Sequence, residues 1–93
     1  MSDTPLTGGS SGYYIADVTH PTRPEVEPYQ AECNDIIEAL DMRFAEANVF
    51  KAVWRRAAAR LGYGKAGTTL LYDAEKMVFF SEREVVREHK NAN

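Results

Sequence analysis

Apolar residues recur at steps of three and four in three segments of this 93-residue chain, and this period constrains its fold more than any other feature. Such a period places apolar side chains along one side of an α-helix. The first segment follows Pro28, a residue that suits the first turn of a helix. Its apolar residues are Tyr29, Cys33, Ile36, Ile37 and Leu40. We therefore predict a first helix of three to four turns that begins at about Pro28.

The same period predicts two further helices. The second runs from about Ala45 to Leu61 and ends at Gly62, because a glycine commonly follows the last helical residue. Its apolar stripe, the predicted core face, is Phe50, Val53, Trp54, Ala57 and Leu61. The third runs from about Leu70 to Arg87, with residues 65–69 as a flexible connection and residues 89–93 frayed. Its apolar face is Leu70, Ala74, Met77, Val78, Ser81 and Val85.

The segment before the first helix has a different character. Tyr13–Val18 has the β-branched and aromatic content of a short strand or extended arm. Pro21, Pro24 and Pro28 then force an extended backbone and forbid a helix before Pro28. The sequence thus predicts a mainly α protein: a flexible tail over residues 1–12, an extended arm over residues 13–27 and a small three-helix domain over residues 28–93.

Composition and charge exclude several classes of protein. A chain of this length has room for one domain, and 44% apolar with 27% charged residues is an ordinary globular balance. No apolar run approaches the roughly 18 residues of a membrane span, and residues 1–12 lack the regions of a signal peptide. A single cysteine cannot form an internal disulfide, and with two distant histidines it does not make a zinc site. We therefore expect a cytoplasmic protein that does not bind membranes.

The net charge of −3 argues against a general DNA binder, and we expect no sequence-specific DNA binding, but the charge is unevenly distributed. Residues 25–41 carry six acidic residues and no basic one, whereas residues 43–65 carry six basic residues against Glu46 alone. Within the basic segment, Asn48, Lys51 and Arg55 are spaced to share one face of the second helix. An amide and two cations beside small alanines suit a phosphate, and a solvated charged face is the alternative interpretation.

Further side chains could complete a nucleotide site. Arg56 flanks the basic face, and Tyr63 lies between two glycines at the end of the same helix, where it could cover a ligand or only cap the helix. Glu32, Asp35 and Asp73 are candidate ligands for Mg²⁺, although acidic residues also favour helix N-termini without any metal. Cys33 lies on the apolar stripe and is predicted to be a buried hydrophobe and not a nucleophile.

Two runs of the sequence resemble the SaV-like phage domain, which is also found in the small nucleotide kinase of lytic podophages. They are ECNDIIEALDMRFAEANVFKAVWRRAAARLG (32–62) and YDAEKMVFFSERE (72–84). The family pattern has an acidic helix with the sequence IDVIE, then a phenylalanine, then GNAIKYLWR and finally DLEKAxWYLxRE. The corresponding residues of this chain are, in the same order, Asp35–Glu38, Phe44, Asn48–Arg55 and Asp73–Glu84. Through this match Lys76 becomes a further candidate ligand-binding residue. The family's opening HY segment is absent, and the kinase is a considerably longer chain, which puts catalysis in doubt. The resemblance implies a helical, nucleotide-related phage protein in the host cytoplasm.

Two functions follow as expectations. In the first, the protein binds a nucleotide or another phosphate-bearing ligand, and binding without turnover is favoured over a kinase-like reaction because 93 residues offer little enclosure. In the second, it is a host-takeover or anti-defence factor that sequesters a nucleotide immune signal or inhibits a host protein directly. We also expect a homo-oligomer with the third helix and the Tyr13–Val18 arm at the interface, because Phe79 and Phe80 flank the predicted core face. The alternative is a monomer in which the arm folds back over Phe79 or Phe80.

Overall fold

The computed structural model describes residues 12–63 and 69–92. A 3₁₀ turn, η1 (Gly12–Tyr14), leads into two strands, β1 (Ile15–Val18) and β2 (Tyr29–Glu32). Three helices follow: α1 (Cys33–Ala39), α2 (Phe44–Arg60) and α3 (Leu70–Ala92). The predicted mainly α fold is confirmed. The predicted tail, apart from Gly12, and the predicted connection, apart from Thr69, lie outside the described residues.

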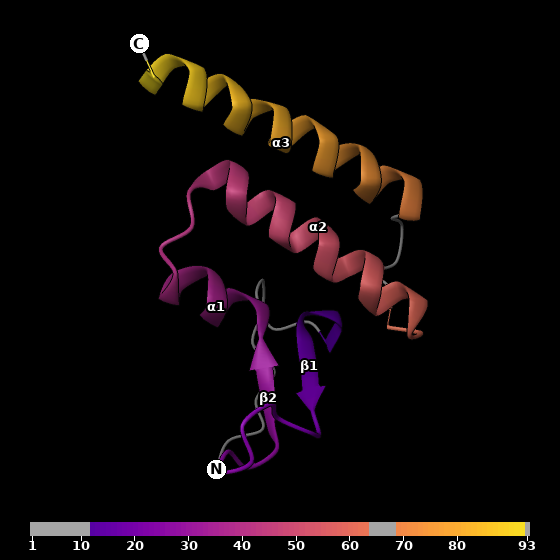
Figure 1. Ribbon diagram of the computed structural model, residues 1–93. Helices are drawn as coiled ribbons and strands as arrows, with labels where there is room; N and C mark the ends of the chain where they lie inside the picture. Colours follow the sequence, from indigo (N-terminus) through magenta and orange to yellow (C-terminus); the bar gives the residue numbers. More distant parts are fainter. Residues whose placement is uncertain (1–11, 64–68, 93) are drawn as a thin grey trace.

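The two longest helices lie alongside each other, and α2 is the middle layer of the molecule (Figure 1). α3 covers one side of α2, while α1 and the β1–β2 sheet lie on the other side. α2 therefore contacts α3, η1 and α1, whereas the two strands contact mainly each other. Among the described residues, none of the helices has the length and the hydropathy of a membrane span.

The first helix begins later than predicted, because residues 29–32 form a strand. β2 pairs antiparallel with β1, with Ile15 opposite Glu32 and Val18 opposite Tyr29. The Gln30 side chain also donates a hydrogen bond to Asp17 Oδ1 at 2.9 Å. Pairing with a strand that lies more than ten residues away overrides the local helical period, so α1 begins at Cys33 and not at Pro28. The strand predicted near Tyr13–Val18 is confirmed over Ile15–Val18.

Backbone capping motifs end the first two helices. The amide of Met42 donates to Ile37 O after α1, and the amide of Tyr63 donates to Ala58 O after α2. Each bond closes a Schellman motif around a residue with positive φ, Asp41 at 53° and Gly62 at 94°. The predicted end of the second helix at Gly62 is confirmed.

The third helix is longer than predicted. It begins after Thr69, whose hydroxyl accepts a hydrogen bond from the Tyr72 amide at 2.9 Å. It continues to Ala92, so the prediction of frayed residues 89–93 is wrong for 89–92. No proline or glycine interrupts this end, and the basic residues of the last turn interact favourably with the helix dipole.

The predicted core stripe of the second helix is only half-buried at Phe50, Trp54 and Ala57, and the most deeply buried residues of the helix lie on a different face. Ala52 has no exposed surface and Arg55 is 7% exposed, whereas Val53 and Leu61, in the predicted core stripe, are 45% and 75% exposed. A small residue such as Ala52 lets a neighbouring helix approach closely, which a row of large side chains does not allow. The predicted basic face is therefore largely the packed face of α2.

The third helix also differs from the prediction in what it buries. Asp73 is buried, while Leu70 and Val85, predicted to face the core, are exposed. Phe80 is half-buried against Phe44 with 5.7 Å between ring centroids, so it is covered within the chain. Within the described residues, Cys33 and Ala52 are the buried apolar residues. The enclosed core of one chain is therefore very small for a protein of this length.

Candidate functional site

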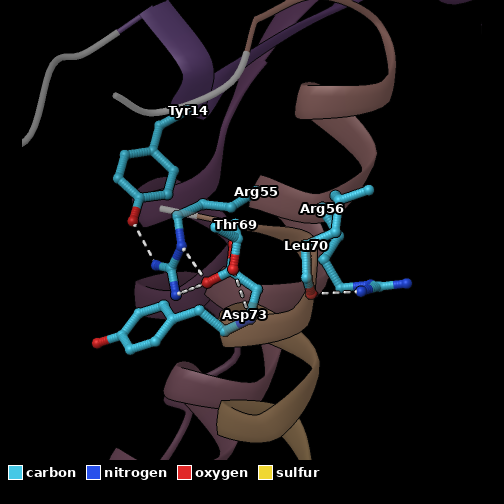
Figure 2. A network of polar contacts seen from close by, with 7 residues as sticks. Tyr14, Arg55, Arg56, Thr69, Leu70 and Asp73 are labelled. Atoms are coloured by element: carbon cyan, nitrogen blue, oxygen red, sulfur yellow. Dashed lines mark hydrogen bonds and ion pairs between the residues drawn. The ribbon is translucent and has the colours of Figure 1, made fainter. Parts of the chain in front are cut away.

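A buried ion pair between Arg55 and Asp73 joins α2 to α3 (Figure 2). The Nε and Nη2 atoms of Arg55 both donate to Asp73 Oδ1, at 3.0 and 2.9 Å. The Nη1 atom donates to the hydroxyl of Tyr14 in η1 at 2.9 Å. The guanidinium thus ties three elements together, and its donors are directed at protein groups.

This arrangement assigns Arg55 a structural role. Burial lowers the pKa of Arg55, but the hydrogen bonds that it donates to Asp73 and Tyr14, with the attraction of their charges, outweigh burial and leave the pKa above its ordinary value. The guanidinium therefore stays charged, and Asp73 neutralises that charge inside the protein. A phosphate could bind the guanidinium only by displacing Asp73 or Tyr14, and displacement of Asp73 would leave a buried carboxylate without its partner.

The other two residues of the predicted phosphate face do not form a site with Arg55. The Asn48 side chain donates to the carbonyl of Phe44 within α2 at 2.8 Å. Lys51 is half-buried close to Cys33, and its positive charge lowers the pKa of the thiol. Burial has the larger effect and raises the pKa of Cys33 overall, so the thiol is protonated. The prediction of Cys33 as a buried hydrophobe is confirmed.

The remaining candidate residues are dispersed. Arg56 donates to the carbonyl of Leu70 at 2.6 Å and so helps to join α2 to the start of α3. Lys76 lies 5.2 Å from the ring centroid of Tyr72, a cation–π contact along α3. Tyr63 is exposed after α2 and borders a different groove. These contacts do not bring the three side chains to a common ligand position.

The acidic residues predicted to hold Mg²⁺ are not gathered either. Asp73 is bound to Arg55, while Glu32 ends β2 and Asp35 lies in the first turn of α1. Within the described residues, no group of three or more histidine, cysteine or acidic side chains could hold a metal ion. The structure therefore offers no support for the predicted ligand set.

A groove between the start of α2 and the second half of α3 combines aromatic and basic side chains. We call it the α2–α3 groove, and it has a volume of about 470 Å³. Its lining includes Phe44, Phe79, Phe80, Arg83, Arg87 and Lys90. Phe44 and Phe79 are 77% and 56% exposed, so their rings are accessible to a ligand. A planar apolar group could stack on them while an anion contacts the cations.

The cations of this groove differ in how they are held. Arg43 donates to Glu84 Oε1 at 2.9 Å, and this hydrogen bond raises the pKa of Arg43. Arg83, Arg87 and Lys90 follow one another at steps of four and three along α3. Within the described residues, none of these three makes a hydrogen bond or ion pair with the protein. They therefore remain available for an anion.

This groove was not predicted from the sequence, although the sequence contains a regular basic pattern at this position. The spacing of Arg83, Arg87 and Lys90 is as regular as that of the predicted face on the second helix. Their proximity to Phe44 depends on the antiparallel packing of α3 on α2, which brings residues more than thirty positions apart into one groove. No local pattern shows that contact.

A second groove lies between α2 and β1, and we call it the α2–β1 groove. It has a volume of about 790 Å³. The whole predicted core stripe of the second helix lines it, together with Ile15, Ala16 and Tyr63. Trp54 anchors one wall, because its indole Nε1 donates to the carbonyl of Tyr13 at 2.9 Å. The apolar stripe of α2 is thus partly covered, at Trp54 by the Tyr13 backbone, and partly open to this groove.

Comparison with known proteins found no matching family model, no matching curated protein and no matching solved structure.

Proposed function

We propose that this protein binds a nucleotide or another phosphate-bearing ligand in the α2–α3 groove. The observation that supports the proposal most strongly is the row Arg83, Arg87 and Lys90, which makes no ion pair among the described residues and lies beside the exposed rings of Phe44 and Phe79. Cations that already neutralise carboxylates, such as Arg55, offer little to an anion. The proposal therefore keeps the ligand expected from the sequence and places it on a different helix.

The two halves of the groove match the two halves of a nucleotide. An exposed phenylalanine ring offers a face for base stacking, worth about 1–3 kcal/mol per base. A guanidinium provides a planar fork for phosphate oxygens, and a lysine provides a point charge. A ligand that has only one of these parts, a nucleoside or inorganic phosphate, should bind more weakly than one that has both.

We propose binding without turnover, because the groove is open. With Phe44 and Phe79 both more than half exposed, water reaches the position where a phosphoryl group would lie. Phosphoryl transfer depends on positioned groups in a site that excludes water. Sequestration of a nucleotide signal, as in an anti-defence role, would use the same groove and release the ligand unchanged. A kinase-like activity would instead convert it.

The test is a thermal-shift screen of mononucleotides, cyclic dinucleotides and ADP-ribose derivatives, with and without Mg²⁺, followed by calorimetry on any ligand found. Arg87→Gln should weaken binding about tenfold or more, since a hydrogen bond to a charged group contributes about 1.5–3 kcal/mol. Phe79→Ala should weaken binding of the nucleotide but not of inorganic pyrophosphate. Chromatography of the recovered ligand distinguishes sequestration from turnover.

Two control variants make the outcome decisive. Arg23→Gln removes an exposed cation in the loop before β2 and should leave binding unchanged. Lys51→Gln should also bind as the wild type does, whereas the face predicted from sequence requires it to lose affinity. If Lys51→Gln loses binding and Arg87→Gln keeps it, the α2–α3 groove is not the site.

A further inference from the structure

The α2–α3 pair leaves apolar side chains exposed on the side opposite the α2–α3 groove. Phe44 marks the groove side of α2, and Val53, nine residues later, lies about 180° around the helix from it. On α3, Asp73 faces α2, while Val78 and Phe79 lie about 130° to either side of that direction. Because Phe79 lines the groove, Val78 shares the opposite side with Val53. We call this side the open face.

The open face is apolar along both helices. Val53 of α2 is 45% exposed, and Leu71 and Val78 of α3 are 67% and 58% exposed. Ala74 lies between Leu71 and Val78 and is half-buried. An exposed apolar surface on two adjacent helices is unusual for a small monomer, in particular one with so little enclosed core.

On α2, the open face has a charged residue on each side of Val53, and the two charges have opposite signs. Glu46 precedes Val53 by seven residues, and Arg60 follows it by seven, so all three lie on one face of the helix. Arg60 is exposed and makes no hydrogen bond or ion pair within the described residues. Glu46 receives the amide of Arg43 on Oε1, and its Oε2 lies 3.6 Å from Arg43 Nη2.

We infer that the open face binds a second copy of this chain, with the two α2 helices antiparallel and Val53 on a two-fold axis. This register places Glu46 opposite Arg60 of the partner subunit, and by symmetry the pair occurs twice. A parallel pairing would instead oppose like charges at both ends. The sign of the end charges therefore selects an antiparallel second copy as the occupant.

The same two-fold axis also brings α3 against the α3 helix of the second copy. Two contacts fix how the antiparallel helices α2 and α3 are aligned along their axes, namely Arg55 with Asp73 and Arg43 with Glu84. In this alignment Val53 of α2 lies beside about Ala74 of α3. A two-fold axis through Val53 thus passes near Ala74, whose small side chain permits close approach of the two α3 helices. Leu71 and Val78 lie three and four residues on either side, so Leu71 meets the partner's Val78. The result is a four-helix bundle whose core is shared between two chains.

Light scattering after size exclusion measures the mass directly. The wild type should have twice the 10.4 kDa of one chain, and a mass of 10.4 kDa at high concentration would overturn the inference. Val53→Glu should give the mass of one chain, since it places two carboxylates together at the axis. Val86→Glu is the matched control, an exposed valine on the groove side of α3, and should keep the double mass.

Charge reversal tests the register. Arg60→Glu and Glu46→Arg should each lower the fraction of dimer, because each opposes like charges twice. Mixing the two variants in equal amounts should restore the dimer, since every pair in the mixed species is again of opposite sign. If the mixture dissociates as readily as either variant alone, the antiparallel pairing is wrong.

Crosslinking provides a measurement that does not rely on loss of assembly. Val53→Cys should form an oxidised dimer, because a residue on the axis is its own neighbour, whereas Val86→Cys should not. The native Cys33 is 2% exposed and does not compete. Equal crosslinking of the two variants would overturn the proposed axis.

Discussion

Removal of the Asp73 carboxylate tests the claim that Arg55 is a structural residue. In Asp73→Ala, the guanidinium keeps its hydrogen bond to Tyr14 but loses both bonds to Oδ1, at a position where only 7% of the arginine is exposed. Breaking a buried pair in this way costs about 3–5 kcal/mol, because one charge is left uncompensated. A chain of 93 residues has a total stability of about 5–14 kcal/mol, so a large share would be lost.

Urea denaturation followed by circular dichroism at 222 nm measures this loss, at one protein concentration for all variants because self-association would contribute to stability. The double variant Arg55→Met/Asp73→Leu removes both charges together and should recover most of the stability, since no buried charge remains. A loss below about 1 kcal/mol in Asp73→Ala, or a double variant as unstable as the single one, would refute the reasoning. If Arg55 were instead a ligand residue, Asp73→Ala would leave stability unchanged and strengthen phosphate binding.

Three further variants or treatments test other parts of the structure. Trp54→Phe removes the hydrogen bond to the Tyr13 carbonyl and should lower the free energy of unfolding by about 1 kcal/mol, measured by thermal denaturation. In Gly62→Ala, the added methyl group meets no atom within 4 Å, so the free energy of unfolding should fall by about 1–2 kcal/mol through the positive φ alone. An unchanged melting temperature would contradict this. Because burial raises the pKa of Cys33, a thiol reagent at pH 8 should react with it only after unfolding, and rapid reaction in the native state would show that the thiol is accessible.

The helical part of the fold could be predicted from the sequence because its causes are local. The apolar period and the stop at Gly62 act within a few residues, and α2 and the start of α3 lie where this pattern placed them. The strand β2 could not be predicted in the same way. Tyr29 fits a helical stripe, but pairing of its segment with β1 is a long-range contact that no local period reveals.

The candidate site could likewise be predicted only in part from the sequence. The sequence singled out Arg55 and Asp73 as chemically important, and both are, but as partners of each other and not as ligands for phosphate and Mg²⁺. Spacing along one helix shows which side chains share a face. It does not show what lies opposite that face, and a cation is free for a ligand only if no carboxylate lies opposite it.

The sequence by itself determined that three helices form, where α2 ends and that Cys33 is buried, since each depends on residues close together in the chain. Only the tertiary structure decided which face of α2 is enclosed. Helix packing selects for close approach as well as for apolar area, so Ala52 and the Arg55–Asp73 pair are the most deeply buried, while Val53 and Leu61 of the larger apolar stripe remain exposed. It also decided which cations are available to a ligand: Arg55 and Arg43 pair with Asp73 and Glu84, whereas Arg83, Arg87 and Lys90 make no hydrogen bond or ion pair within the part of the chain that the structure describes.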